Sequence, residues 1–180
     1  MDDKIFYDNE YVLWLEFDEN TTTFLNSKCE ALAEQEIEPG VRPPHLTLSF
    51  IRSDNEKELK ELVIHFFDKV KELSFTLNSV GAFSGGVLFY GPKVTIELLQ
   101  LHKNLCQVIS ETADLSWDLY VPGKWTPHIA LTGGLSKEDA KKAFTIMMSE
   151  FESIKTSVVS VKLRRLTTGK EIVNYSIENY

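Results

Sequence analysis

Apolar residues recur along this chain at two spacings, one typical of strands and one typical of helices. Aromatic and branched residues predict a strand over 11–17, and an apolar stripe at helical spacing predicts a helix over 21–35. The same criteria predict strands over 45–51, 75–83, 87–90, 158–166 and 172–177, and helices over 54–70, 95–112 and 138–150. Short turns join several of these strands, which favours an antiparallel or mixed sheet with helices packed outside it.

Two ten-residue segments share one sequence pattern, which we call the repeated phrase. Residues 39–48 read PGVRPPHLTL and residues 122–131 read PGKWTPHIAL, so His45 and His128 occupy equivalent positions 83 residues apart (128 − 45 = 83). Coincidence between two strand–turn–helix units is the alternative explanation. Generic strands, however, do not require the shared Pro-Gly and Pro-His positions, so we interpret the phrase as part of an internal duplication.

The similarity continues beyond the histidines. Ser53 and Ser136 each follow a histidine by eight residues and fit the start of a capped helix. Residues 74–80 then align with 157–163 at the same offset. We therefore expect one domain over residues 1–180, with an α+β fold. It would be bilobal and internally duplicated, with antiparallel or mixed sheets, outer helices and a central cleft.

The first histidine strand is expected to offer polar groups on one face. In a strand, residues i and i+2 point to the same side. His45, Thr47 and Ser49 would therefore project together, while the intervening residues through Phe50 face the core. In the second copy His128 would share its face with Ala130 and Thr132, which leaves one fewer hydroxyl on that side.

Two histidines that meet in one cleft are sufficient for proton transfer on both sides of a phosphate ester. A neutral imidazole of His45 or His128 takes a proton from the attacking group, and the other ring, protonated, donates to the leaving oxygen. Thr47 would donate to a nonbridging phosphate oxygen. The pattern implies no metal and no cofactor, and it does not say which histidine is the acid. A divalent-metal hydrolase is a weaker alternative, because no carboxylate or third ligand stands beside either histidine.

The motifs His45-Leu46-Thr47-Leu48 and His128-Ile129-Ala130-Leu131 resemble the two H-x-[ST]-x motifs of the 2H phosphoesterases. That superfamily includes the bacterial 2′-5′ RNA ligases and cyclic phosphodiesterases. The resemblance covers most of the chain. It implies a phosphodiesterase, with ligation as the reverse reaction, acting on 2′,3′-cyclic phosphates or 2′-5′ linkages without metal. The family usually carries Thr or Ser where this chain has Ala130, so the alternative is a nucleotide- or RNA-binding module that kept the cleft and lost efficient catalysis.

Four further residues are candidates for substrate binding. Arg42 and Lys124 precede the two histidine strands and are candidates to hold phosphate, although each is equally compatible with an ordinary exposed loop. Trp125 is a candidate to stack on a base, with core packing as the alternative. Thr132 lies about 6–7 Å beyond Ala130 along the strand, so it replaces the missing hydroxyl only if the phosphate shifts or a water bridges.

Composition limits the partners. The net charge of −8 argues against a long grip on duplex nucleic acid but is compatible with a small nucleotide or RNA end. No apolar run reaches the roughly 20 residues that cross a bilayer, and the acidic start lacks the layout of a secretory signal. Cys29 and Cys106 stand apart, which suits a reducing compartment. We expect a cytoplasmic monomer.

Overall fold

The structure is a computed structural model that describes residues 7–149 and 151–177. Every predicted strand and helix is found, with bounds that shift by a few residues, and the short strand β5 was not predicted. The histidine strand of the second copy is only two residues long. In chain order the elements are β1 (Glu10–Phe17), α1 (Glu19–Glu34), β2 (Leu46–Arg52), α2 (Glu56–Phe67), β3 (Ser74–Ala82), β4 (Leu88–Pro92), α3 (Ile96–Ile109), β5 (Asp114–Leu115), the 3₁₀ turn η1 (Asp118–Tyr120), β6 (Ile129–Ala130), α4 (Lys137–Met148), β7 (Ile154–Arg165) and β8 (Glu171–Ser176).

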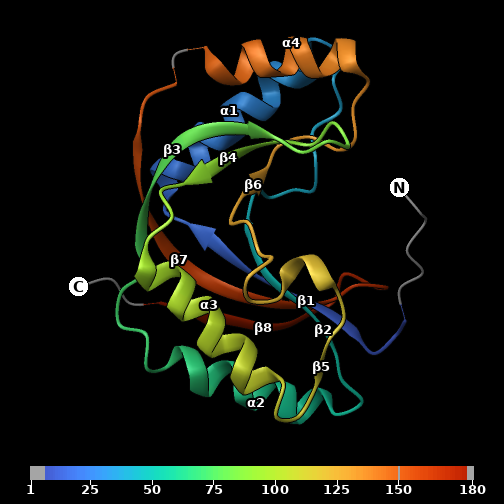
Figure 1. The fold of residues 1–180 in the computed structure, drawn as a ribbon, viewed down its shortest axis with the longest axis vertical. Helices are drawn as coiled ribbons and strands as arrows, with labels where there is room; N and C mark the ends of the chain where they lie inside the picture. Colours follow the sequence, from blue (N-terminus) through green and yellow to red (C-terminus); the bar gives the residue numbers. More distant parts are fainter. Residues whose placement is uncertain (1–6, 150, 178–180) are drawn as a thin grey trace.

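One open antiparallel sheet joins two lobes, which confirms the predicted α+β fold (Figure 1). The strand order is β5-β2-β1-β7-β3-β4-β6, with β8 also paired to β7. The C-terminal part of β7 pairs with β1 and β8, and its first residues pair with β3. We call β5, β2, β1 and β8 with α2 and α3 the β2 lobe, and β3, β4 and β6 with α1 and α4 the β6 lobe.

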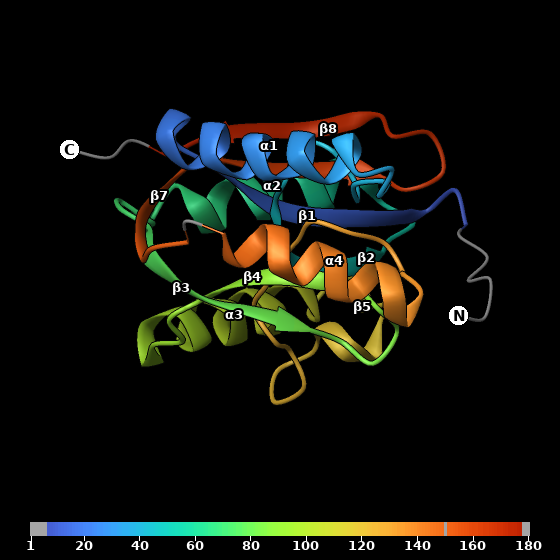
Figure 2. The same ribbon diagram turned by 90° about the horizontal axis from the view of Figure 1, so that it is seen from above.

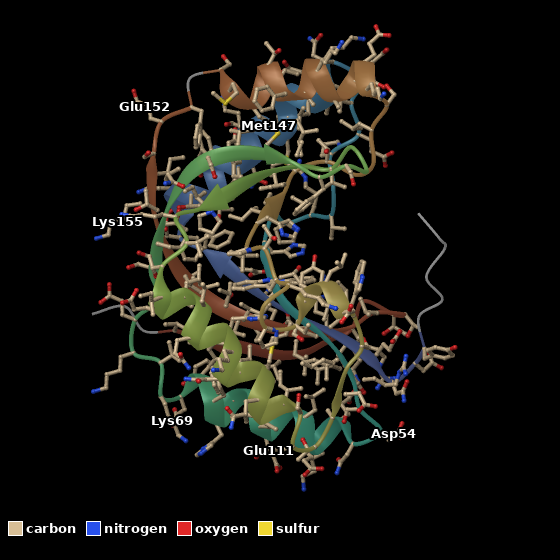
Figure 3. All side chains as sticks on the ribbon, viewed as in Figure 1. Asp54, Lys69, Glu111, Met147, Glu152 and Lys155 are labelled. Atoms are coloured by element: carbon tan, nitrogen blue, oxygen red, sulfur yellow. The ribbon has the colours of Figure 1, made fainter. Side chains whose placement is uncertain are left out.

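The helices lie outside the sheet, one pair on each lobe. Seen from above, α1 and α4 lie side by side over the β6 lobe (Figure 2). Helices α2 and α3 pack together on the β2 lobe at the opposite end of the molecule (Figure 1). Exposed charged side chains such as Asp54, Lys69 and Glu111 lie on that outer end, away from the space between the lobes (Figure 3). None of the helices in the described ranges is long and apolar enough to cross a membrane.

Local capping chemistry sets where the helices begin. Ser136 accepts a hydrogen bond from the backbone N of Asp139 at 3.1 Å and caps α4, as the sequence predicted. In the first copy the cap is Asn55, which accepts from the N of Glu58 at 3.2 Å, so the prediction of Ser53 as the cap was wrong. The Ser53 hydroxyl instead accepts from the Asn55 N, and the helix starts two residues later.

A β-bulge in β2 changes which side chains face the space between the lobes. Leu13 of β1 pairs with Ser49, but the next residue of β1 pairs with Thr47, so Leu48 is an extra residue on β2. An extra residue reverses the in-and-out alternation beyond it. Ser49 is therefore fully buried, and Phe50 packs with Val12 and Trp14 on the other face of the sheet. The expectation that Ser49 faces the cleft and Phe50 the core was wrong for this reason.

Candidate active site

A cleft of about 730 Å³ lies between the lobes and receives residues from both copies of the repeated phrase. The first copy contributes His45 and Thr47, and the second contributes His128 and Ala130. The remaining walls are largely apolar. They include Val41, Phe50, Phe83, Val87, Trp117, Leu119 and Tyr120. Of the other predicted residues, Lys124 and Thr132 also line the cleft.

Both histidine rings are held in the same way. The Nδ1 of His45 lies 2.8 Å from the carbonyl oxygen of Pro43, and the Nδ1 of His128 lies 2.7 Å from that of Thr126. A carbonyl oxygen only accepts, so Nδ1 carries the hydrogen in each ring. The lone pair of the neutral ring is then on Nε2, the atom left for proton transfer. In both copies the acceptor is the carbonyl two residues before the histidine, so the duplication extends to side-chain geometry.

Burial favours the neutral form of both rings. It lowers the pKa of His45, and the nearby charge of His128 lowers it further, whereas the Pro43 carbonyl and Glu16 oppose the shift. Burial also lowers the pKa of His128, against the effect of the Thr126 carbonyl. An anion between the rings favours the protonated form. A phosphate-bearing ligand would therefore bring one ring into the acid state that proton donation needs.

The two histidines differ in what surrounds them. The His45 ring stacks on Trp14 with centroids 4.1 Å apart and an interplanar angle of 24°. The Arg164 guanidinium lies 5.2 Å from the Trp14 ring centroid, and the indole N–H donates to Glu16 at 3.3 Å. His128 instead meets aromatic rings edge-on: Phe83 at 4.8 Å and Phe89 at 5.4 Å between centroids. Charged groups thus lie near His45, and apolar rings surround His128.

The hydroxyl missing at Ala130 is not supplied by its neighbour on the strand. The Oγ1 of Thr132 accepts a hydrogen bond from the backbone N of Leu88 at 2.9 Å and donates to the carbonyl of Gly86 at 3.4 Å. This hydroxyl is committed to joining the segment just after β6 to β4. Thr47, which is 8% exposed, lines the cleft and offers the hydroxyl of the first motif.

The candidate cations differ in position. Lys124 is exposed, forms an ion pair with Asp118 at the rim, and is the only lysine or arginine among the described residues that line the cleft. Arg42 is not part of the lining. Its Nη1 donates to the Oδ1 of Asn26 on α1 at 3.3 Å, and its charge acts on the nearby buried thiol of Cys29.

Trp125 lies below the cleft surface and not in it. It is 7% exposed, its indole N–H donates to the carbonyl of Thr47 at 3.0 Å, and its ring stacks on that of His102 at 4.0 Å. In this position it offers no open face to a base. Core packing, the alternative considered for this residue, describes its surroundings.

Sequence reasoning missed Trp14, whose ring supports His45. One signal was available, because Val12, Trp14 and Glu16 alternate with the core residues of β1 and so share the opposite face of the sheet, where Trp14 packs with Val12. No comparable signal in the sequence marks His102. Within residues 7–149 and 151–177, no group of three His, Cys, Asp or Glu side chains is arranged to hold a metal ion.

Comparison with known proteins finds solved structures of similar fold and one family model that matches the chain. The chain resembles crystal structures of E. coli LigT in complex with NADP+ (15% identity, TM-score 0.59, covering 96% of this chain and 99% of that chain) and of a phosphoesterase (16%, 0.60, 96% and 100%). It also resembles TT0787 of Thermus thermophilus (16%, 0.59, 94% and 98%). A search of curated proteins finds no match. The model of the 2′-5′ RNA ligase superfamily matches residues 30–170, and the chain therefore belongs to this superfamily of 2H phosphoesterases.

Proposed function

We propose that this protein is a metal-independent phosphodiesterase that acts on 2′,3′-cyclic phosphates or on 2′-5′ linked nucleotides and RNA ends. One observation carries the proposal: His45 and His128 line one cleft, and each donates Nδ1–H to a backbone carbonyl. Both rings are thereby oriented with Nε2 available for proton transfer. General acid and base catalysis of this kind contributes about 10²–10⁴-fold for each group in its transition state.

Hydrolysis of a cyclic phosphate needs two coupled proton transfers. The Nε2 of the neutral histidine takes a proton from water as the water oxygen attacks phosphorus. The bond from phosphorus to one ribose oxygen breaks, and the protonated histidine donates its Nε2 proton to that oxygen. Thr47 donates to a nonbridging oxygen as charge builds up there. Lys124 lies at the rim, where its positive charge attracts the phosphate of the incoming substrate. The two rings end with exchanged protonation states. The same groups would serve ligation, in which a 5′-hydroxyl of a second nucleotide replaces water as the attacking group on the cyclic phosphate.

The dimensions and charge of the cleft favour a small substrate. Its volume of about 730 Å³ falls within the range of small-molecule sites, roughly 300–1,000 Å³. With Lys124 as its one lining cation among the described residues, it suits a single phosphodiester better than a chain of phosphates. LigT, similar in fold, has been crystallised with ATP, 3′-AMP and phosphate, which supports a ligand of nucleotide size here.

The test is turnover of a 2′,3′-cyclic nucleotide and of a 2′-5′ linked dinucleotide by three variants. His45→Ala and His128→Ala are each expected to abolish turnover while circular dichroism and thermal unfolding stay near wild type. His65→Ala, in an exposed position on α2, is the matched control and is expected to keep full activity. Rates that survive both cleft substitutions would reject the proposal, and loss of activity in EDTA would reject its metal-independent form.

Ala130 and the committed hydroxyl of Thr132 favour one alternative, a nucleotide- or RNA-binding module with weakened catalysis. Calorimetry with a 2′-phosphorylated nucleotide separates the two functions. Tight binding with no product from any cyclic or 2′-5′ substrate supports the binding module. Measurable turnover that depends on both histidines supports the enzyme.

The proposal treats residues 1–180 as one bilobal domain that acts as a monomer in the cytoplasm. Cys29 and Cys106 are buried free thiols, which is compatible with a reducing compartment. Sedimentation velocity at several concentrations tests the oligomeric state, and a dimer at the lowest concentration would contradict it.

A further inference from the structure

In each copy of the repeated phrase, residues that precede the histidine contact the histidine strand of the other copy or the residues just after it. The backbone N of Gly40 donates to the carbonyl of Leu131 at 2.7 Å, and Pro39 forms a β-bridge with Thr132. In the opposite direction, the indole N–H of Trp125 donates to the carbonyl of Thr47 at 3.0 Å. The segments just before the two histidines are therefore exchanged between the lobes.

Trp125 contacts β2 on the edge opposite β1, at a point where no strand of the described residues pairs with that edge. In the part of the chain that the structure describes, β5 pairs with β2 only at Ile51 and Arg52. The bulge at Leu48 turns a second carbonyl away from the regular ladder, and this oxygen lies 3.0 Å from the Nε2 of His102. Trp125 and His102 thus hydrogen-bond to two consecutive carbonyl oxygens of β2. Without these partners the buried carbonyls would be unpaired, which costs free energy of folding.

The two side chains form one unit. The Trp125 and His102 rings stack with centroids 4.0 Å apart and an interplanar angle of 9°. Trp125 is 7% exposed and His102 is 2% exposed, so water does not compete well for either hydrogen bond. Packed, hydrogen-bonded side chains of this kind fix backbone positions more tightly than a loop alone.

Trp125 is also adjacent to the group that orients the second histidine. The carbonyl of Thr126, the next residue, accepts from the Nδ1 of His128. The dipeptide 125–126 therefore holds the backbone of Thr47 on one wall and the ring of His128 on the other. We propose that Trp125 is a positioning residue that sets the placement of Thr47 relative to His128, and that His102 supports it by holding the bulge at Leu48.

The kinetic part of this inference rests on the proposed function. Trp125→Phe keeps an aromatic ring against His102 and removes the N–H that reaches Thr47. Misplacement of reacting groups by about 1 Å can cost about 100-fold in rate, so we expect kcat to fall by about 10- to 100-fold with KM within about twofold of wild type. A residue that only stabilises the fold would lower the unfolding midpoint and leave kcat unchanged.

Tyr90→Phe is the matched control. The Tyr90 hydroxyl is fully buried and donates to the carbonyl of Met147 at 2.6 Å, between β4 and α4 and away from the cleft lining. This variant also loses one buried donor to one backbone carbonyl. It is expected to lose stability without the fall in kcat. A second pair isolates the support from α3: His102→Gln keeps a donor for Leu48 and is expected to retain more activity than His102→Leu.

A second experiment does not depend on turnover. It records two-bond ¹H–¹⁵N spectra of the imidazoles at a pH where His45 and His128 are both neutral. Wild-type His128 is expected to show a protonated Nδ1 and an unprotonated Nε2. Trp125→Phe should give a mixture of tautomers at His128, because the Thr126 carbonyl is no longer held, and Tyr90→Phe should match wild type. If wild type shows no turnover, the proposed function fails while this comparison still decides the role of Trp125.

A His128 tautomer unchanged in Trp125→Phe, together with an unchanged kcat, would overturn the inference. If Trp125→Phe does not fold, the His102 pair decides: a mixed His128 tautomer in His102→Leu but not in His102→Gln supports it. Identical spectra in that pair reject it.

Discussion

Replacing Ala130 with threonine is expected to make this protein a faster catalyst. Ala130 is half-buried, lines the cleft, and occupies the position equivalent to Thr47 in the other copy. Its backbone pairs with Phe89 of β4, and that pairing does not involve the side chain. The threonine hydroxyl would enter the cleft beside the phosphate without displacing an existing hydrogen bond, since the nearby hydroxyl of Thr132 is directed at β4.

The size of the gain follows from the missing donor. One hydrogen-bond donor to a developing oxyanion is worth about 2.7–4 kcal/mol of barrier. Restraining the new side chain in one rotamer costs about 1 kcal/mol. The remaining 1.7–3 kcal/mol, roughly, corresponds to an increase in kcat of about 20- to 150-fold. Because the side chain faces a cleft and not the core, the unfolding midpoint should change little.

The assay is single-turnover hydrolysis of a 2′,3′-cyclic nucleotide, with product release removed from the measured rate. Ala130→Val is the matched control, since valine has nearly the shape of threonine and no hydroxyl. We expect Ala130→Thr to be faster than wild type and Ala130→Val to be equal or slower. If both variants show the same rate, a hydroxyl at this position contributes nothing, and the reasoning from the repeated motifs is refuted.

Three further predictions concern other parts of the cleft and its support. Thr47→Val should lower kcat by about 10²–10³-fold in the same assay, and an unchanged rate would exclude Thr47 as a phosphate donor. Lys124→Ala should raise KM by about two- to fivefold with kcat preserved. Asp118→Asn removes the ion-pair partner of Lys124 and should lower KM, so the two variants are expected to change KM in opposite directions. Burial lowers the pKa of His102, so the unfolded chain binds more protons below about pH 6.5. Stability is then full above that pH and falls as pH drops toward the lowered folded pKa, and urea unfolding at about pH 5 and about pH 8 should show a smaller difference in His102→Gln than in wild type.

The repeated phrase made most of the fold and half of the cleft predictable. Helices and strands followed from apolar spacing, and two histidines at equivalent positions implied a shared site. The bulge at Leu48 was not predictable, because an extra residue in a strand leaves the local pattern unchanged and is defined only by the partner strand. As a result, Phe50 and Ser49 exchanged faces.

The role of Trp125 was beyond sequence reasoning for a related reason. Its partners, Thr47 and His102, lie 78 and 23 residues away along the chain (125 − 47 and 125 − 102). Nothing in the local sequence distinguishes an indole that stacks on a base from one that donates a hydrogen bond to a carbonyl at the edge of a strand. Arg42 illustrates the same limit, since its direction is set by Asn26 on α1 and not by its own neighbours.

The shared strand β7 has a consequence for how the protein is made. β7 begins at Ile154, after the four helices of the described residues, yet it forms the ladder with β1, β3 and β8. A nascent chain that stops before Ile154 leaves β1 and β3 with open edges that can pair with other chains. Neither lobe can then complete its sheet while most of the protein is still being translated. A premature stop codon that removes β7 would therefore cost the entire fold and not one lobe, and would yield an aggregation-prone product.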